Sequence, residues 1–135
     1  MKRTLIALLF GGLLSACAGS PTKPAAPPDQ DFLMHVVLVW LKQPGNAQHR
    51  AQIITASQRL REIPGVLDLY VGEVVPSDRP VVEDSYDVAL SLRFATQADL
   101  QAYLSHPIHV DAVKQKFVPL MQRYQVVDFA AGSGL

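Results

Sequence analysis

The segment from Phe32 to Leu41 most restricts how this chain can fold. It is apolar at both its odd and its even positions and rich in β-branched and aromatic residues. The side chains of a strand point alternately to its two faces, so a strand with one wet face alternates apolar and polar residues. This segment does not alternate, and it therefore predicts a β-strand whose two faces are both covered.

The rest of the chain predicts a regular series of further elements. Asn46 is an expected N-cap, and Pro64-Gly65 an expected stop, for a helix over about 47–62. We predict strands over 66–75 and 86–94, helices over 97–104 and from Pro107 to about Pro119, and a last strand over 124–129. This β-α-β-β-α-β order is typical of an α+β, ferredoxin-like subunit, with one antiparallel four-stranded sheet and its helices on one face.

Such a sheet leaves one face without helices, whereas residues 32–41 predict cover on both faces. The segment 66–75 also carries large apolar side chains at both alternating positions. A second copy of the chain, stacked sheet against sheet about a two-fold axis, would cover the open face. The pattern therefore predicts a homodimer.

Composition excludes several classes of protein. The chain has 135 residues, 49% of them apolar, with twelve basic and twelve acidic side chains. This length fits one domain, and the absence of a basic run argues against a nucleic-acid binder. The single cysteine excludes an internal disulfide and a CxxC pair.

The N-terminus has the pattern of an export signal. Lys2 and Arg3 precede an apolar stretch over 5–14, about half of the roughly 20 residues that a membrane-spanning helix needs. We therefore predict a signal peptide over 1–16. Its end, Leu14-Ser15-Ala16-Cys17, resembles the lipobox of bacterial lipoproteins.

The lipobox resemblance implies a diacylglycerol and an acyl chain on Cys17, and hence a membrane anchor in the bacterial cell envelope. Ala18, in place of a retention aspartate, favours the outer membrane facing the periplasm. The alternative is an ordinary secretory signal with an incidental cysteine. Residues 17–30 form the lipidated cysteine and a Pro/Ala-rich tether, 31–130 the folded domain and 131–135 a flexible tail.

The folded part resembles the stress-responsive dimeric A/B barrel (Dabb) family over about 32–129. The resemblance is carried by Met34-His35-Val36-Val37, Ile63-Pro64-Gly65-Val66, Tyr86-Asp87-Val88-Ala89-Leu90 and Tyr103-Leu104-Ser105-His106-Pro107-Ile108-His109-Val110. Its most specific part is Tyr-x-x-His-Pro-x-His together with the early strand histidine. The family implies a ferredoxin-like subunit and a dimer in which the two sheets form a barrel-like core.

One plant member of the family cyclises a linear polyketide with the tyrosine and the second histidine of this motif, which correspond to Tyr103 and His109. The resemblance thus implies these two residues as catalytic candidates, with His35, His106 and Val88 as ligand-binding candidates. Val88 stands where that cyclase has a strand histidine, and Ala56 where it has a helix tyrosine. The two differences indicate another substrate.

Two functions remain open on these residues. The first is a lipid-anchored module that binds a small apolar ligand or supports envelope partners under stress. The alternative is a cofactor-free acid/base enzyme, cyclase- or isomerase-like, in which His109 is a neutral base near a helix N-terminus and Tyr103 a donor. In a purely structural interpretation, His106 and His109 cap the helix and fill space beside the first strand.

Metal and haem binding are weaker alternatives. His106, His109 and Asp111 have ligand chemistry, but Asp111 points away from His109 on a helix, and His35 would have to complete the set. Haem rests on fold analogy alone. We therefore predict neither a metal nor another cofactor. Asp68, Glu73 and Asp87 could be paired carboxylates on neighbouring strands, but we interpret them as solvated strand ends.

Overall fold

The computed structural model describes residues 31–132. The predicted signal peptide, Cys17, the tether and most of the predicted tail lie outside these residues. The elements are β1 (Phe32–Leu41), α1 (Ala47–Gln58), η1 (Arg59–Glu62), β2 (Val66–Glu73), β3 (Val88–Phe94), α2 (Gln97–Ser105), α3 (Pro107–Ala112), η2 (Val113–Phe117), α4 (Val118–Leu120) and β4 (Met121–Ala131).

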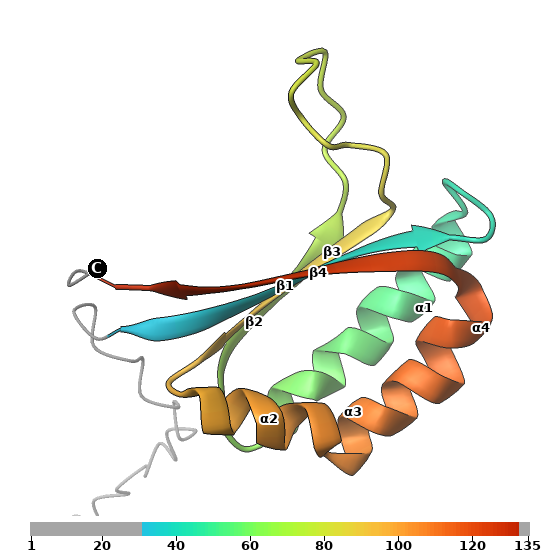
Figure 1. Cartoon of the computed structure of the whole chain (residues 1–135). Coiled ribbons are helices and arrows are strands. Elements are labelled where there is room, and N and C mark those ends of the chain that lie inside the picture. Colours follow the sequence, from blue (N-terminus) through green and yellow to red (C-terminus); the bar gives the residue numbers. More distant parts are fainter. Residues whose placement is uncertain (1–30, 133–135) are drawn as a thin grey trace, which may run out of the picture.

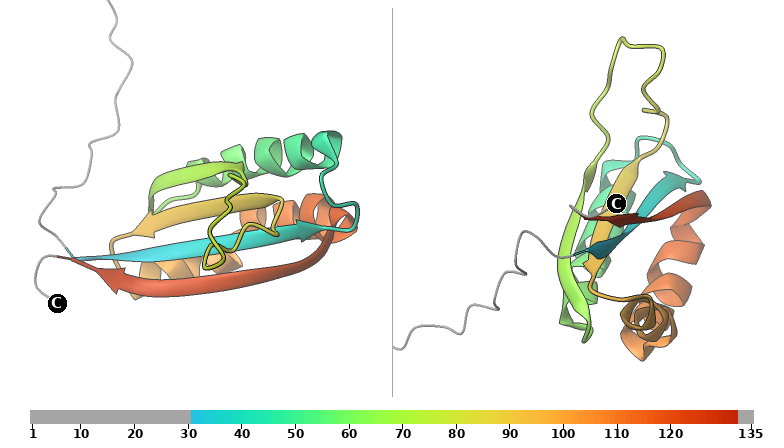
Figure 2. Two further views of the ribbon diagram at one scale, coloured as in Figure 1. Left: turned by 90° about the horizontal axis from the view of Figure 1, so that it is seen from above. Right: turned by 60° about the vertical axis from the view of Figure 1, so that its left-hand side comes forward.

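The four strands form one antiparallel sheet in the order β2-β3-β1-β4. Figure 1 shows the helices gathered on one side of this sheet, and Figure 2 shows β2 and β4 at its two edges. The predicted α+β, ferredoxin-like β-α-β-β-α-β subunit is confirmed. The side of the sheet that carries the helices is called the helix face below, and the other side the open face.

The core lies between the helix face and the helices. In β3, Val88, Leu90, Leu92 and Phe94 are buried and alternate with half-buried residues, as the sequence alternation predicts. The helices contribute further buried side chains, among them Ile53, Leu60, Leu100, Tyr103 and Phe117. Burial of this apolar layer is the main force that holds the helices to the sheet.

β1 presents apolar side chains to the open face, where they are only partly covered. Met34, Val36 and Leu38 of β1 are half-buried there. Trp40 is 7% exposed, because the Arg123 guanidinium lies 3.3 Å from its ring centroid and its Nε1–H donates to Ser85 Oγ at 2.9 Å. Residues 31–132 thus leave the predicted second layer over this face incomplete.

The helix predicted from Pro107 and the last strand both differ from their predicted boundaries. The predicted helix from Pro107 onward is divided into α3, the π-helical turn η2 and the short α4, with Pro119 inside α4. Proline has no N–H to donate into a helix, which interrupts the regular hydrogen-bond ladder here. β4 is longer than predicted, because its backbone pairs with β1 from Met121 to Ala131 whatever the polarity of its side chains.

A long connection joins β2 to β3. Residues 74–87, called the arm below, project beyond the ends of the strands (Figures 1 and 2). The predicted strands over 66–75 and 86–94 are correspondingly shorter, ending at Glu73 and beginning at Val88. Among residues 31–132, no helix has the length and apolar character needed to cross a membrane.

Candidate functional site

A cavity of about 320 Å³ lies between β1, β4 and the helices. Most of its wall is aliphatic or aromatic, and five residues with polar atoms interrupt it. The lining residues are His35, Val37, Val39, Leu60, Leu90, Tyr103, Leu104, His109, Val113, Phe117, Met121, Tyr124, Val126 and Asp128. A cavity of this size with a few convergent polar groups is typical of a site for a small molecule.

His35 forms the first polar pair of the cavity. It lies on the helix face of β1 and is 4% exposed, and its Nδ1 is 2.6 Å from Oδ1 of Asp128 on β4. The two residues are register partners in the antiparallel β1–β4 pair, so their side chains lie on the same face of the sheet. Because a carboxylate only accepts, Nδ1–H of His35 donates and Nε2 is the free ring nitrogen.

His109 is held by a backbone acceptor. Its Nδ1 is 2.9 Å from the Leu104 carbonyl oxygen, which has no proton, so Nδ1–H donates and Nε2 carries the lone pair. Burial lowers the pKa of His109 below its ordinary value. The Leu104 hydrogen bond opposes this change, and the nearby His35 adds to it. The cavity therefore favours a neutral imidazole with an available basic nitrogen.

Tyr103 lies between the two histidines. Its ring centroid is 4.6 Å from that of His109 and 5.9 Å from that of His35, and the residue is 2% exposed. Burial raises the pKa of its hydroxyl, which therefore stays protonated. Within residues 31–132 the hydroxyl has no hydrogen-bond partner, so its proton is available to a ligand oxygen.

The break between α2 and α3 brings Tyr103 and His109 together. His106 is extended, with φ −67° and ψ 137°, and its Nδ1 accepts from the Ile108 N–H at 3.3 Å as the N-cap of α3. Pro107 occupies the first turn of α3, where its missing N–H costs nothing. The short turn folds α3 back so that His109 packs on Tyr103.

The other predicted ligand residues lie elsewhere. The described cavity lining includes His35, Tyr103 and His109 but neither His106 nor Val88. His106 caps α3, and Val88 is fully buried in the core. Among the described residues, no group of three or more His, Cys, Asp or Glu side chains is placed to hold a metal ion, so His35, His106, His109 and Asp111 do not form such a group.

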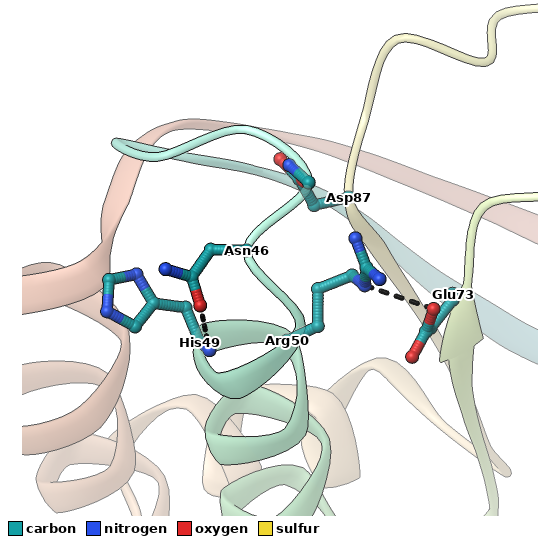
Figure 3. Close-up of polar contacts among 6 residues, drawn as sticks. Asn46, His49, Arg50, Glu73 and Asp87 are labelled. Atoms are coloured by element: carbon teal, nitrogen blue, oxygen red, sulfur yellow. Dashed lines mark hydrogen bonds and ion pairs between the residues drawn. The ribbon is translucent and has the colours of Figure 1, made fainter.

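The three strand-end carboxylates have structural partners. Asp87 is 5% exposed and accepts from the backbone N–H groups of Leu41, at 2.9 Å, and Gly45, at 2.6 Å, so its interpretation as a solvated strand end is wrong. Glu73 pairs with Arg50 of α1 at 3.0 Å, close to Asp87 in Figure 3. Asp68 pairs with Arg93 on the neighbouring strand.

Asp128 lines the cavity but is not among the site residues predicted from the sequence. One signal was available: Asp128 is the only acidic residue in the predicted strand over 124–129. Its role depends on the β1–β4 register, which places it opposite His35. Without that register, a strand-borne aspartate is indistinguishable from a solvated one.

Fold and site together define a ferredoxin-like α+β domain with a histidine- and tyrosine-lined cavity under its helices. Over residues 33–131 the chain matches the family model described as the stress responsive A/B barrel domain, and it belongs to this Dabb family.

Several solved structures are similar to the chain. A Dabb family protein with a ferredoxin-like fold from Mesorhizobium loti is 26% identical, with 74% of this chain and 96% of that chain covered and a TM-score of 0.61. A dimeric ferredoxin-like protein of unknown function from Thermobifida fusca is 23% identical, with 76% and 92% covered and a TM-score of 0.61. The hydroxynitrile lyase from Passiflora edulis is 22% identical, with 81% and 99% covered and a TM-score of 0.62. No curated protein matches the chain.

Proposed function

We propose that this Dabb domain binds a small, largely apolar molecule that carries an oxygen atom. The observation that carries this proposal is the cavity itself, an apolar chamber in which the Tyr103 hydroxyl and the Nε2 atoms of His35 and His109 have no hydrogen-bond partner among residues 31–132. An apolar ligand gains from the aliphatic wall. A carbonyl or hydroxyl on that ligand satisfies the polar groups that would otherwise stay unpaired.

Binding of 2-naphthol, followed by its fluorescence, tests this proposal. The probe is a flat apolar ring system with one hydroxyl. We expect saturable binding that Tyr103→Phe and His109→Gln each weaken about tenfold, the equivalent of one lost hydrogen bond of about 1.4 kcal/mol. His49→Gln, at a histidine on α1 outside the cavity lining, is the matched control and should bind as the parent does. Absence of saturable binding by the parent chain would contradict the proposal.

A second candidate function is acid/base catalysis by the same residues. The observation that favours it is the His109–Leu104 hydrogen bond, which fixes the tautomer with a basic Nε2, beside a tyrosine that stays protonated. Nε2 would accept a proton from the carbon next to a ligand carbonyl, and Tyr103 would donate a hydrogen bond to the carbonyl oxygen as negative charge develops there. The hydroxynitrile lyase of similar fold shows that this architecture can accommodate an enzyme.

Proton exchange measures that chemistry directly. Acetophenone in D2O should exchange its methyl protons faster with the parent chain than with buffer, as followed by NMR. His109→Gln and Tyr103→Phe should each remove the acceleration, while His49→Gln retains it. Binding of 2-naphthol without any accelerated exchange would leave the binding function and exclude this second one.

The subunit is proposed to form a homodimer through its open face. Tyr70 is 69% exposed, Phe129 47% and Val127 44%, and all three lie on that face by strand alternation. Several large apolar side chains exposed on one face indicate an interface, and solved structures of similar fold from Thermobifida fusca and Bacteroides fragilis are described as dimeric. Sedimentation of residues 31–135 at micromolar concentration should give twice the subunit mass.

The chain is further proposed to be a lipoprotein anchored through Cys17 in the cell envelope, facing the periplasm from the outer membrane. Support comes from the Leu14-Ser15-Ala16-Cys17 pattern after a short apolar stretch. Intact-mass measurement of membrane-extracted protein should show loss of residues 1–16 and added lipid. An unmodified Cys17 thiol in the membrane fraction would contradict the anchor.

A further inference from the structure

The cavity has an uncovered mouth along β4. On the helix face of this strand, Tyr124 is 59% exposed and Val126 40% exposed, although both line the cavity. A second copy on the open face would cover Val127 and Phe129 but not these two side chains, which point to the opposite side. The mouth therefore needs cover that comes around the free edge of β4.

The two free edges of the sheet are suited to meet in a dimer. β1 and β2 are each antiparallel to β3, and β4 is antiparallel to β1, so the edge strands β2 and β4 run in opposite directions. A two-fold axis parallel to the strands preserves every strand direction. Around such an axis the two open faces stack about 10 Å apart with β2 of the partner subunit antiparallel to β4, and where the two sheets curl together into a barrel these two edges approach to one strand spacing of about 5 Å.

Register determines which part of the partner reaches the mouth. Along one transverse line of the sheet, Glu73 pairs with Val88, Val88 with Val39, and Val39 with Tyr124. The end of β2 therefore lies at the same height along the strands as Tyr124. Rotation about a two-fold axis parallel to the strands does not change this height. The first residues of the partner's arm thus lie beside the mouth.

Val75 is the arm residue that lies toward the helix face and is exposed to solvent. Val75 stands two positions after Glu73, whose carboxylate pairs with Arg50 of α1. The Val74 N–H still donates to the Asp87 carbonyl oxygen at 3.4 Å, so continuing the alternation of β2 past its end places Val75 on the helix-face side. The Val75 side chain is 77% exposed in the subunit. Residues 83–86 of the arm are held over the open face instead, where Ser85 and Tyr86 contact Trp40.

We propose that Val75 of the partner subunit packs against Tyr124 and closes the cavity mouth, so that each ligand site is built from two subunits. The proposal rests on the proposed dimer and deepens the proposed binding function. Val75 supplies an apolar wall where the subunit alone leaves the ligand open to water. Dimerisation and ligand binding then become coupled, because only the dimer has a closed site.

Cysteine cross-linking tests the placement. The full chain with Cys17→Ser receives Val75→Cys and Tyr124→Cys together, and is oxidised in mild detergent. Within one chain these positions lie on opposite edges of the sheet, about 14 Å apart at three strand spacings, beyond the roughly 7 Å limit of a disulfide. A disulfide-linked dimer is expected. The control pair is Val81→Cys in the arm together with Gln52→Cys on α1. This pair should form no disulfide-linked dimer.

The possible outcomes distinguish a failure of the composite site from a failure of the proposed dimer. A dimer by sedimentation that does not cross-link through Val75 and Tyr124, either by oxidation or with a short bismaleimide, overturns the composite site and leaves the dimer in place. A monomeric parent overturns both the dimer and the composite site.

Ligand binding gives a second test. Val75→Asp should weaken the binding of 2-naphthol at least fivefold. Val81→Asp, which changes a valine 83% exposed on the same arm, should change that affinity less than twofold. Equal effects of the two variants contradict the proposal.

Discussion

Asp128 and His35 face each other across β4 and β1 with 2.6 Å between Oδ1 and Nδ1, and the imidazole is buried while the carboxylate side chain is 49% exposed. The carboxylate thus fixes the orientation of a buried ring from a position that water still reaches. In the described part of the chain, this arrangement leaves Nε2 of His35 as the ring nitrogen without a hydrogen-bond partner.

Replacing Asp128 by Asn should loosen that ring. The amide keeps the size of the side chain but loses the charge-assisted hydrogen bond, which we expect to cost about 1 kcal/mol of unfolding free energy at this half-exposed position. Urea denaturation measures the change. Asp111→Asn, at an exposed position on α3, is the control and should change stability by less than about 0.5 kcal/mol. Equal losses in both variants would show that the Asp128–His35 bond contributes nothing.

His109 should titrate below its ordinary value of 6.5, because burial opposes the charged form. The unfolded chain then binds this proton more readily than the folded one. The stability that this group contributes is therefore present above about pH 6.5 and is lost as the pH falls toward the folded pKa. NMR titration of the imidazole resonance, assigned by its absence in His109→Gln, gives the midpoint. A midpoint at or above 6.5 would contradict the burial argument.

Asp87→Asn should be the most destabilising of the carboxylate replacements. Asp87 is buried and accepts two backbone N–H groups, and an amide nitrogen turned toward either of them leaves that donor unpaired. We expect a loss of about 2–3 kcal/mol in urea denaturation. Asp84→Asn, where a single N–H from Ser77 is accepted in the arm, should cost less than about 1 kcal/mol.

Gly65 and Gly45 provide a paired test of backbone strain and packing. Both have positive φ, 89° and 74°, so alanine at either position should cost about 1–2 kcal/mol. At Gly65 the added Cβ would also lie 3.1 Å from Cβ of Asp99, whereas at Gly45 the nearest atom is 4.0 Å away. Gly65→Ala should therefore destabilise the fold more than Gly45→Ala in thermal denaturation, and the reverse order would contradict this packing argument.

Most of the fold was predictable because its signals are local. The alternation in 86–94, the cap at Asn46 and the stop at Pro64-Gly65 each depend on a few neighbouring residues, and all three correspond to observed features. The ends of strands were less predictable. β4 extends to Met121 and Ala131 because β1 offers backbone partners there, and no property of residues 121–123 announces this pairing.

The site was predictable only in part, because some of its contacts depend on residues far apart in the sequence. The Tyr-x-x-His-Pro-x-His spacing identified Tyr103 and His109, which a single helix break brings together. The role of Asp128 was not predicted, because it depends on the register of β4 against β1. The role of the Leu104 carbonyl was not predicted either, because a backbone group leaves no side-chain signal in the sequence. The burial of Asp87 was missed because its two partners are N–H groups 42 and 46 residues away.

The π-helical turn η2 makes the cavity wall adjustable by chain length. Val113 and Phe117 line the cavity from the two ends of this turn. An α-helix advances by about 100° per residue, so removing one residue from η2 would turn Phe117 by about that angle away from the chamber. The sheet, which holds His35 and Asp128, would be untouched. A one-residue deletion would therefore change the shape of the cavity while its polar groups on the sheet stay in place.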